Sequence, residues 1–175
     1  MGMGMTDQLP TYHVIADPSE SIREEDAHEA WFLATIPFLK GLASTYQGYT
    51  TDQRYAEYLF EQTGIGTTRA SGSWSGQVLG RALGMCADRG WPALPSLVVD
   101  RDTGMCSAGL DGWHRSAGAE PADATGQEEL AARLRVHCYR RYALDVPEDV
   151  VKFHTPLHLG WLTRQRRTAG KFLTY

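Results

Sequence analysis

Apolar side chains recur at intervals of three and four residues through most of the chain, which is the spacing of amphipathic helices. The first predicted helix follows Ser21, because Ser-Ile-Arg-Glu has the form of a capping box. Its apolar stripe consists of Ala27, Ala30, Trp31, Ala34 and Phe38. Pro37 is expected to kink or break this helix, since proline has no amide hydrogen and clashes with the preceding turn.

Two more helices are predicted in close succession. The first is Thr51–Thr63, in which Thr51 is the expected N-cap and Gly64 the C-terminal glycine. The second is Ser73–Arg89, with a serine at position 71 or 73 as its expected cap. Its apolar stripe consists of Trp74, Val78, Leu79, Ala82, Leu83 and Cys86.

A stretch of strand character follows and predicts a small β-hairpin. The apolar run Leu94–Asp100 is the first strand, and Met105–Leu110 is the expected return strand. Between them lies an Asp-Thr-Gly turn, in which Gly104 accepts the positive φ that a tight turn requires.

The last third of the chain begins with a linker of small residues, Ser116–Gly126. A capping box at Thr125 predicts a helix that extends to about Tyr142. This helix should turn Leu130 and Leu134 inward and Arg133, Arg140 and Arg141 outward. A short helical piece is expected from Pro147, and Pro156 is expected to interrupt the chain again.

The order helix, loop, helix and ribbon is typical of a winged helix-turn-helix, in which the second helix enters a groove of duplex DNA. We therefore expect an α+β protein that is mostly helical, with a winged helix-turn-helix core and a small β-hairpin. Its parts are an N-terminal helical lead (1–48), a winged-helix-like core (49–115), and a linker with a basic C-terminal helical segment (116–175). With 175 residues, the three parts should form one compact domain.

The charge of the chain is unevenly distributed, although the net charge is only −4. Residues 1–80 contain four basic and ten acidic side chains, whereas the stretch from Glu129 onward contains nine basic and four acidic ones. The basic end is suited to a phosphate backbone, and equally to an acidic partner protein. No apolar run is long enough to cross a bilayer, and no signal peptide is evident, so we expect a cytoplasmic protein and no membrane partner.

Two segments, Gly76–Leu83 (GQVLGRAL) and Leu97–Gly104 (LVV-x-x-D-x-G), separated by a Pro-containing link, resemble the C-terminal domain of the DNA alkyltransferases and alkyltransferase-like proteins. The resemblance covers residues 49–110 and implies a winged helix that enters the minor groove and extrudes a base. This chain has Gln77 where the family has the arginine that replaces the flipped base, and Ser96-Leu97-Val98 where it has Cys-His-Arg. The nucleophilic cysteine is missing, so alkyl transfer is excluded and the scaffold alone is expected.

Eight residues are expected to contact nucleic acid. Free amides at the start of the second helix favour a phosphate, and arginine and glutamine side chains on its surface can reach a phosphate or a base edge. An arginine at the hairpin tip, one in the loop between the helices and two in the C-terminal helix would meet the backbone. The residues are Arg69, Ser73, Ser75, Gln77, Arg81, Arg101, Arg140 and Arg141, and Trp113 and Trp161 are further candidates for contact.

Other reactive side chains do not assemble into a catalytic or metal site in the sequence. His154 and His158 have the i, i+4 spacing of a metal pair, but Pro156 lies between them. Asp100, Asp102 and Asp111 are typical turn residues. The three cysteines are scattered and lack CxxC spacing, so we expect neither a disulfide framework nor zinc. No nucleophile elbow or nucleotide-binding fingerprint is present, and we expect no catalytic residue, metal or cofactor.

Two functions remain open from the sequence. The first is a non-catalytic protein that binds duplex DNA in a bacterial defence, plasmid or regulatory system. The excess of arginine over lysine suggests a bacterial source, since only three of the 17 Lys and Arg residues are Lys. The second is a protein-binding module, such as an immunity protein, inhibitor or complex subunit, whose acidic front and basic rear contact a partner or a second copy. Convergence of Arg69, Arg81 and Arg101 on one face favours DNA, and scatter favours a protein partner.

Overall fold

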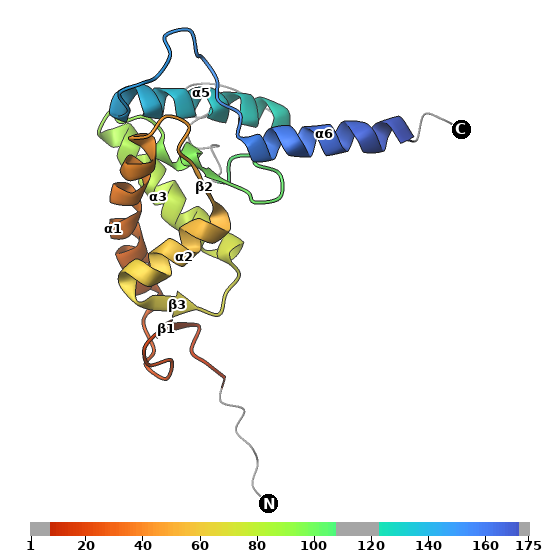
Figure 1. The fold of residues 1–175 in the computed structure, drawn as a ribbon. Helices are drawn as coiled ribbons and strands as arrows, with labels where there is room; N and C mark the ends of the chain where they lie inside the picture. The colour runs from red at the N-terminus through yellow and green to blue at the C-terminus, as the bar shows by residue number, and fades with distance from the viewer. Residues whose placement is uncertain (1–7, 108–122, 172–175) are drawn as a thin grey trace, which may run out of the picture.

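A computed structural model describes residues 8–107 and 123–171 of the chain (Figure 1). It is a mixed α+β structure in which helices predominate, as expected. In chain order the elements are β1 (Tyr12–Val14), α1 (Glu24–Ala43), β2 (Thr50–Thr51), α2 (Asp52–Thr63), β3 (Ile65–Thr67), the 3-10 turn η1 (Ser71–Ser73), α3 (Ser75–Asp88), the 3-10 turn η2 (Leu94–Leu97), β4 (Val98–Val99), α5 (Ala124–Tyr142) and α6 (Pro156–Lys171).

Helix α1 packs against both α2 and α3, and α5 lies across the end of α1 and contacts η2 (Figure 1). The helix α6 extends away from this body as a projecting arm (Figure 1). None of the described helices combines the length and the apolar character needed to cross a membrane.

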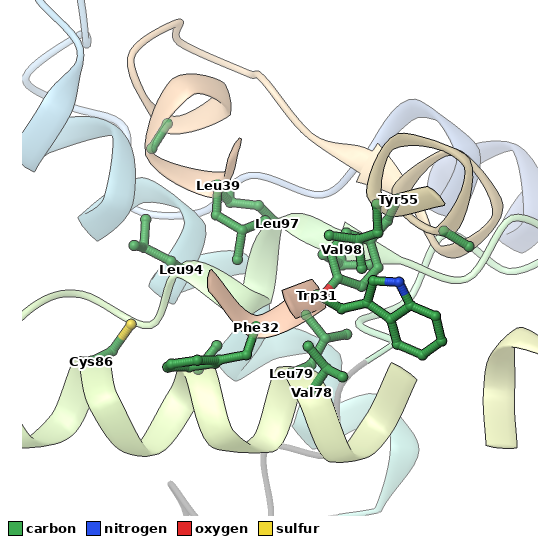
Figure 2. Close-up of a cluster of buried hydrophobic side chains, with 14 of the residues drawn as sticks. Trp31, Phe32, Leu39, Tyr55, Val78, Leu79, Cys86, Leu94, Leu97 and Val98 are labelled. Atoms are coloured by element: carbon green, nitrogen blue, oxygen red, sulfur yellow. The ribbon is translucent and has the colours of Figure 1, made fainter. Parts of the chain in front are cut away.

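One hydrophobic cluster joins α1, α2, α3, η2 and α5. Figure 2 shows labelled residues of this cluster from α1, α2, α3, η2 and β4. Trp31 of α1 and Trp74, just before α3, are fully buried, and their ring centroids lie 4.3 Å apart. The indole nitrogen of Trp31 donates a hydrogen bond to the carbonyl of Ile65 at 3.3 Å, so its polar atom is satisfied inside the core. The predicted apolar stripe of the second helix, from Trp74 to Cys86, is buried throughout.

The helix boundaries agree with the sequence where the capping signal is local. Thr51 caps α2, since its hydroxyl accepts the amide of Arg54 at 3.3 Å, and Gly64 ends α2 with a φ of 67°. The predicted box at Ser21 is wrong: α1 begins at Glu24 without a side-chain cap. The amide of Ile22 donates to the carbonyl of Tyr12 instead, because this segment is extended against β1.

Three proline and serine expectations are also corrected. Pro37 does not break α1. Because proline has no amide hydrogen, the carbonyl of Leu33, one turn earlier, loses its helical hydrogen bond. Leu33 is on the exposed side of the helix, so water can bond this carbonyl instead. No serine side chain caps α3, because the Ser73 hydroxyl donates to the carbonyl of Ala70 within η1. Pro156 begins α6 rather than interrupting the chain, and a proline at the first helical position leaves no amide unpaired.

The β structure is smaller than predicted and is paired differently. β1 pairs with β3 in an antiparallel sheet, and β2 pairs with β4 in a parallel one. Of the run Leu94–Asp100, the first part forms the 3-10 turn η2, and only Val98–Val99 is a strand. The hairpin turn is present, because Gly104 has a φ of 65° and its amide bonds the carbonyl of Asp100 at 2.8 Å. The return segment makes one bridge, Val99 to Cys106, and the predicted strand beyond residue 107 lies outside the described residues.

Helix α5 follows the predicted orientation of its arginines. Arg133, Arg140 and Arg141 are exposed on α5, and Leu134 is buried. The cap of α5 is Asp123, whose carboxylate accepts the amide of Gly126 at 2.8 Å, rather than Thr125. The segment from Pro147 contains a turn but no helix.

Candidate functional site

The exposed face of α3 is built on glycine. Gly76, Gly80 and Gly84 are spaced four residues apart and therefore form a single exposed row on the helix. A Cβ atom added at any of the three would meet no atom within 4 Å, so the fold itself does not require glycine there. Each glycine in a helix interior costs about 1 kcal/mol relative to alanine. The row thus leaves the backbone of α3 open to a surface outside the molecule.

A groove runs beside this row between α1 and α3, and we call it the α1–α3 groove. Its walls carry both signs of charge in nearly equal number. From the α1 side it is lined by Arg23, Glu24, Glu25, His28, Glu29 and Phe32, and from α3 by Gln77, Val78, Arg81, Gly84, Met85, Asp88 and Arg89. The groove is consequently not a strongly positive surface.

Arg81 lies across the middle of the groove. Its guanidinium pairs with the carboxylate of Glu29 and lies 3.9 Å above the ring of Phe32. Both charged side chains are about half exposed, at 51% and 49%. Ion pairs with this exposure typically contribute between about 0.2 and 1 kcal/mol, so a phosphate can compete with Glu29 for Arg81.

The other predicted contacts at the start of α3 are divided between surface and core. Gln77 is exposed and lines the groove. Ser73 is exposed, but its hydroxyl already donates to the carbonyl of Ala70 at 2.7 Å. Ser75 is buried, with 4% of its surface exposed, so its side chain does not reach the surface of the protein.

Arg69 and Arg101 lie on different elements. Arg69 is 3.5 Å from the carboxylate of Glu24, at the first turn of α1. Arg101 donates to the side-chain oxygen of Gln53 at 2.8 Å, at the start of α2. Arg69 and Arg81 therefore share α1 as their partner, whereas Arg101 does not join them.

A cluster that the sequence analysis did not assemble lies where α1, α3 and α5 end. The ammonium of Lys40 is 3.7 Å from the ring centroid of Trp91 and 5.9 Å from that of Tyr142. Arg89 and Arg141 flank the same two rings, at 5.1 Å from Trp91 and 5.4 Å from Tyr142. We call these five residues the basic corner. The sequence signal for this cluster is a cation at or beside the end of each helix. Such cations are common in helices, so the signal does not indicate that the three ends meet.

Arg140, the neighbour of the basic corner on α5, is engaged by the backbone. It donates to the carbonyls of Glu148 and Val150, at 3.1 and 2.6 Å. On the projecting arm α6, by contrast, Arg164, Arg166 and Arg167 are exposed, and this helix contains no acidic residue. Trp161 stacks on His158 near the start of α6, and Trp113 lies outside the described residues.

Compared with protein-family models, curated proteins and solved structures, the chain matches none of them.

The remaining reactive side chains have structural partners. Cys86 and Cys138 are buried, and burial raises the pKa of both thiols, that of Cys138 to about 12, so both stay protonated at neutral pH. The ring of His158 lies 3.1 Å from the carbonyl of Thr103, and that of His154 lies 3.1 Å from the carboxylate of Glu129. Within residues 8–107 and 123–171, no group of three or more His, Cys, Asp or Glu side chains is arranged to hold a metal ion.

Proposed function

We propose that the protein is a non-catalytic DNA-binding protein that presents the exposed face of α3 to a groove of the duplex. The observation that carries this proposal is the row of Gly76, Gly80 and Gly84, which has no steric role within the fold. A helix without side chains on one face can approach a groove wall or a sugar-phosphate strand more closely than any other helix. The order of elements from α2 to the turn after β4 supports the same proposal.

In this proposal, each side chain that flanks the glycine row has a role. The row from Gly76 to Gly84 covers about 12 Å along the helix axis, which is between about three and four base pairs of duplex. Gln77 and Arg81 stand beside the row, four residues apart and on the same side of the helix. Glutamine suits an adenine edge, and arginine a guanine edge or a phosphate. Binding would draw Arg81 from Glu29 at little cost, since that pair is half exposed.

The experiment is a fluorescence anisotropy titration of labelled duplex and single-stranded DNA with the purified protein, across a salt series. The proposal predicts binding to the duplex that weakens linearly on a plot of log affinity against log salt concentration. An absence of duplex binding even at low salt would overturn it.

Replacing Glu29 with glutamine is expected to strengthen duplex binding several-fold. The change releases Arg81 and removes a negative charge from the α1–α3 groove. The matched control is Glu61→Gln, which makes the same charge change at an exposed position on α2. Anisotropy should show a clear gain for Glu29→Gln and little change for Glu61→Gln; equal affinities for both variants would contradict the role given to Arg81.

A second candidate function is a protein-binding module. The separation of Arg101 from Arg69 and Arg81 favours it, because scatter of these three arginines is the expectation for a protein partner. Arg69 and Arg81 both face carboxylates of α1, so the front of the molecule keeps its acidic character, while α6 carries only cations. In this alternative the two surfaces meet an oppositely charged partner or a second copy. This alternative predicts no binding to DNA. If the partner is a second copy, light scattering after gel filtration should give a molecular mass that rises with protein concentration and falls with salt.

A further inference from the structure

We propose that the basic corner is a binding site for the phosphodiester backbone of DNA, and that it anchors the strand that passes the exposed face of α3. This inference rests on the proposed function, since it assigns the position of the phosphates relative to α3. It concerns Lys40, Arg89 and Arg141 together with the two rings that hold them.

Three helices converge on the corner. α1, α3 and α5 all end in the upper left of Figure 1, and Lys40, Trp91 and Tyr142 connect their ends. The C-terminus of a helix carries about half a negative charge, which one nearby cation more than offsets. Each of the three ends has such a cation. Even with the carboxylate of Asp88, the last residue of α3, the corner keeps a small positive excess.

The aromatic rings position the cations of the corner. In the described part of the chain none of the three forms an ion pair with a carboxylate, in contrast to Arg23, Arg69, Arg81 and Lys152. Asp88 is the acidic neighbour in the adjoining groove, and it makes no such pair with Arg89. The rings of Trp91 and Tyr142 are half-buried against the core, so they hold the cations above a rigid surface. Fixed, unpaired arginine and lysine side chains are the usual partners of phosphate groups.

The corner is continuous with the surface proposed to face DNA. Arg89 lines the end of the α1–α3 groove next to Gly84 and Met85. From Gly80 to Arg89 the helix advances about 14 Å, which is about four base pairs along one strand. A single duplex can therefore contact the glycine row and the corner at the same time. This continuity favours the backbone of DNA over a small phosphate-bearing ligand.

The test compares two pairs of arginine substitutions in the anisotropy titration. The corner variant carries Arg89→Met and Arg141→Met, and keeps Lys40 to preserve its packing on Trp91. The control variant carries Arg54→Met and Arg133→Met, two exposed arginines on α2 and α5 that form no ion pair among the described residues. Both variants have the same net charge and the same substitution chemistry, and thermal melting checks that both are folded.

The slope of log affinity against log salt concentration is expected to be about two units less steep in the corner variant. Each phosphate contact contributes about 0.9 to the steepness, and this variant removes two arginines. Its affinity at low salt should fall on the order of tenfold or more, while the control variant keeps the wild-type slope. An unchanged slope in the corner variant, or an equal reduction in both variants, overturns the anchor while the proposed function stands. A wild-type protein that does not bind duplex DNA overturns both.

Discussion

Replacing Arg135 with methionine is expected to destabilise the protein by about 3–5 kcal/mol, because it leaves a buried carboxylate without its arginine partner. Arg135 and Glu128 are almost completely buried, with 0% and 2% of their side chains exposed. The guanidinium donates to Glu128 at 2.6 and 3.2 Å, to the carbonyl of Ser96 at 2.8 Å and to that of Phe153 at 3.1 Å. It thereby ties α5 to η2 and to the segment that leads into α6.

The measurement is the free energy of unfolding from urea denaturation. Arg133→Met is the matched control, since Arg133 is exposed on the same helix, and it should change the free energy by less than about 0.5 kcal/mol. Adding Glu128→Met to Arg135→Met should restore part of the loss, because no charge is then left buried. A loss of under 1 kcal/mol for Arg135→Met would contradict this account of the pair.

Gly104→Ala is expected to destabilise the protein by about 1–3 kcal/mol more than Gly90→Ala. Both glycines have a φ of 65°, so alanine meets the same backbone strain at each. At Gly90 the new Cβ has nothing within 4 Å, whereas at Gly104 it would lie 2.2 Å from the amide nitrogen of His158. The turn after β4 packs directly against the first turn of α6. A methyl group added at Gly104 must therefore displace α6.

Urea denaturation of the two variants gives this difference directly. Amide hydrogen exchange in the first turn of α6 should also accelerate in Gly104→Ala and not in Gly90→Ala. Equal destabilisation by the two substitutions would show that the contact between Gly104 and α6 does not bear on stability.

The contrast between predicted and observed elements follows from how local each signal is. Thr51 and Gly64 bound α2 as expected, because an N-cap and a left-handed glycine act within one turn of the helix. The prediction of a capping box at Ser21 is wrong because β1, eight to ten residues earlier in the pairs of Ser21 and Ile22, bonds with that segment. The pairing of β2 with β4 joins residues that are 48 apart, and no local pattern encodes it.

The same distinction applies to the candidate site. The exposed positions of Gln77 and Arg81 follow from the periodicity of the apolar stripe on α3. The partner of Arg81 does not, since Glu29 precedes it by 52 residues. Arg135 is two residues from the exposed Arg133, and its burial depends on the carbonyls of two distant segments. The basic corner requires three helix ends to meet, which the sequence alone does not specify.

A comparison of Gly80→Gln with Gly41→Gln in duplex binding decides whether the exposed face of α3 meets DNA. Both glycines are exposed within helices, and a Cβ at either meets nothing within 4 Å, so both variants should fold and gain about 0.5–1 kcal/mol of helix stability. Glutamine adds bulk without charge. We expect Gly41→Gln to bind duplex DNA like the wild type, and Gly80→Gln to bind at least about tenfold more weakly, since a loss of 1.4 kcal/mol suffices for that factor. Equal binding by the two folded variants would contradict the claim that the glycine face of α3 is the surface that meets DNA.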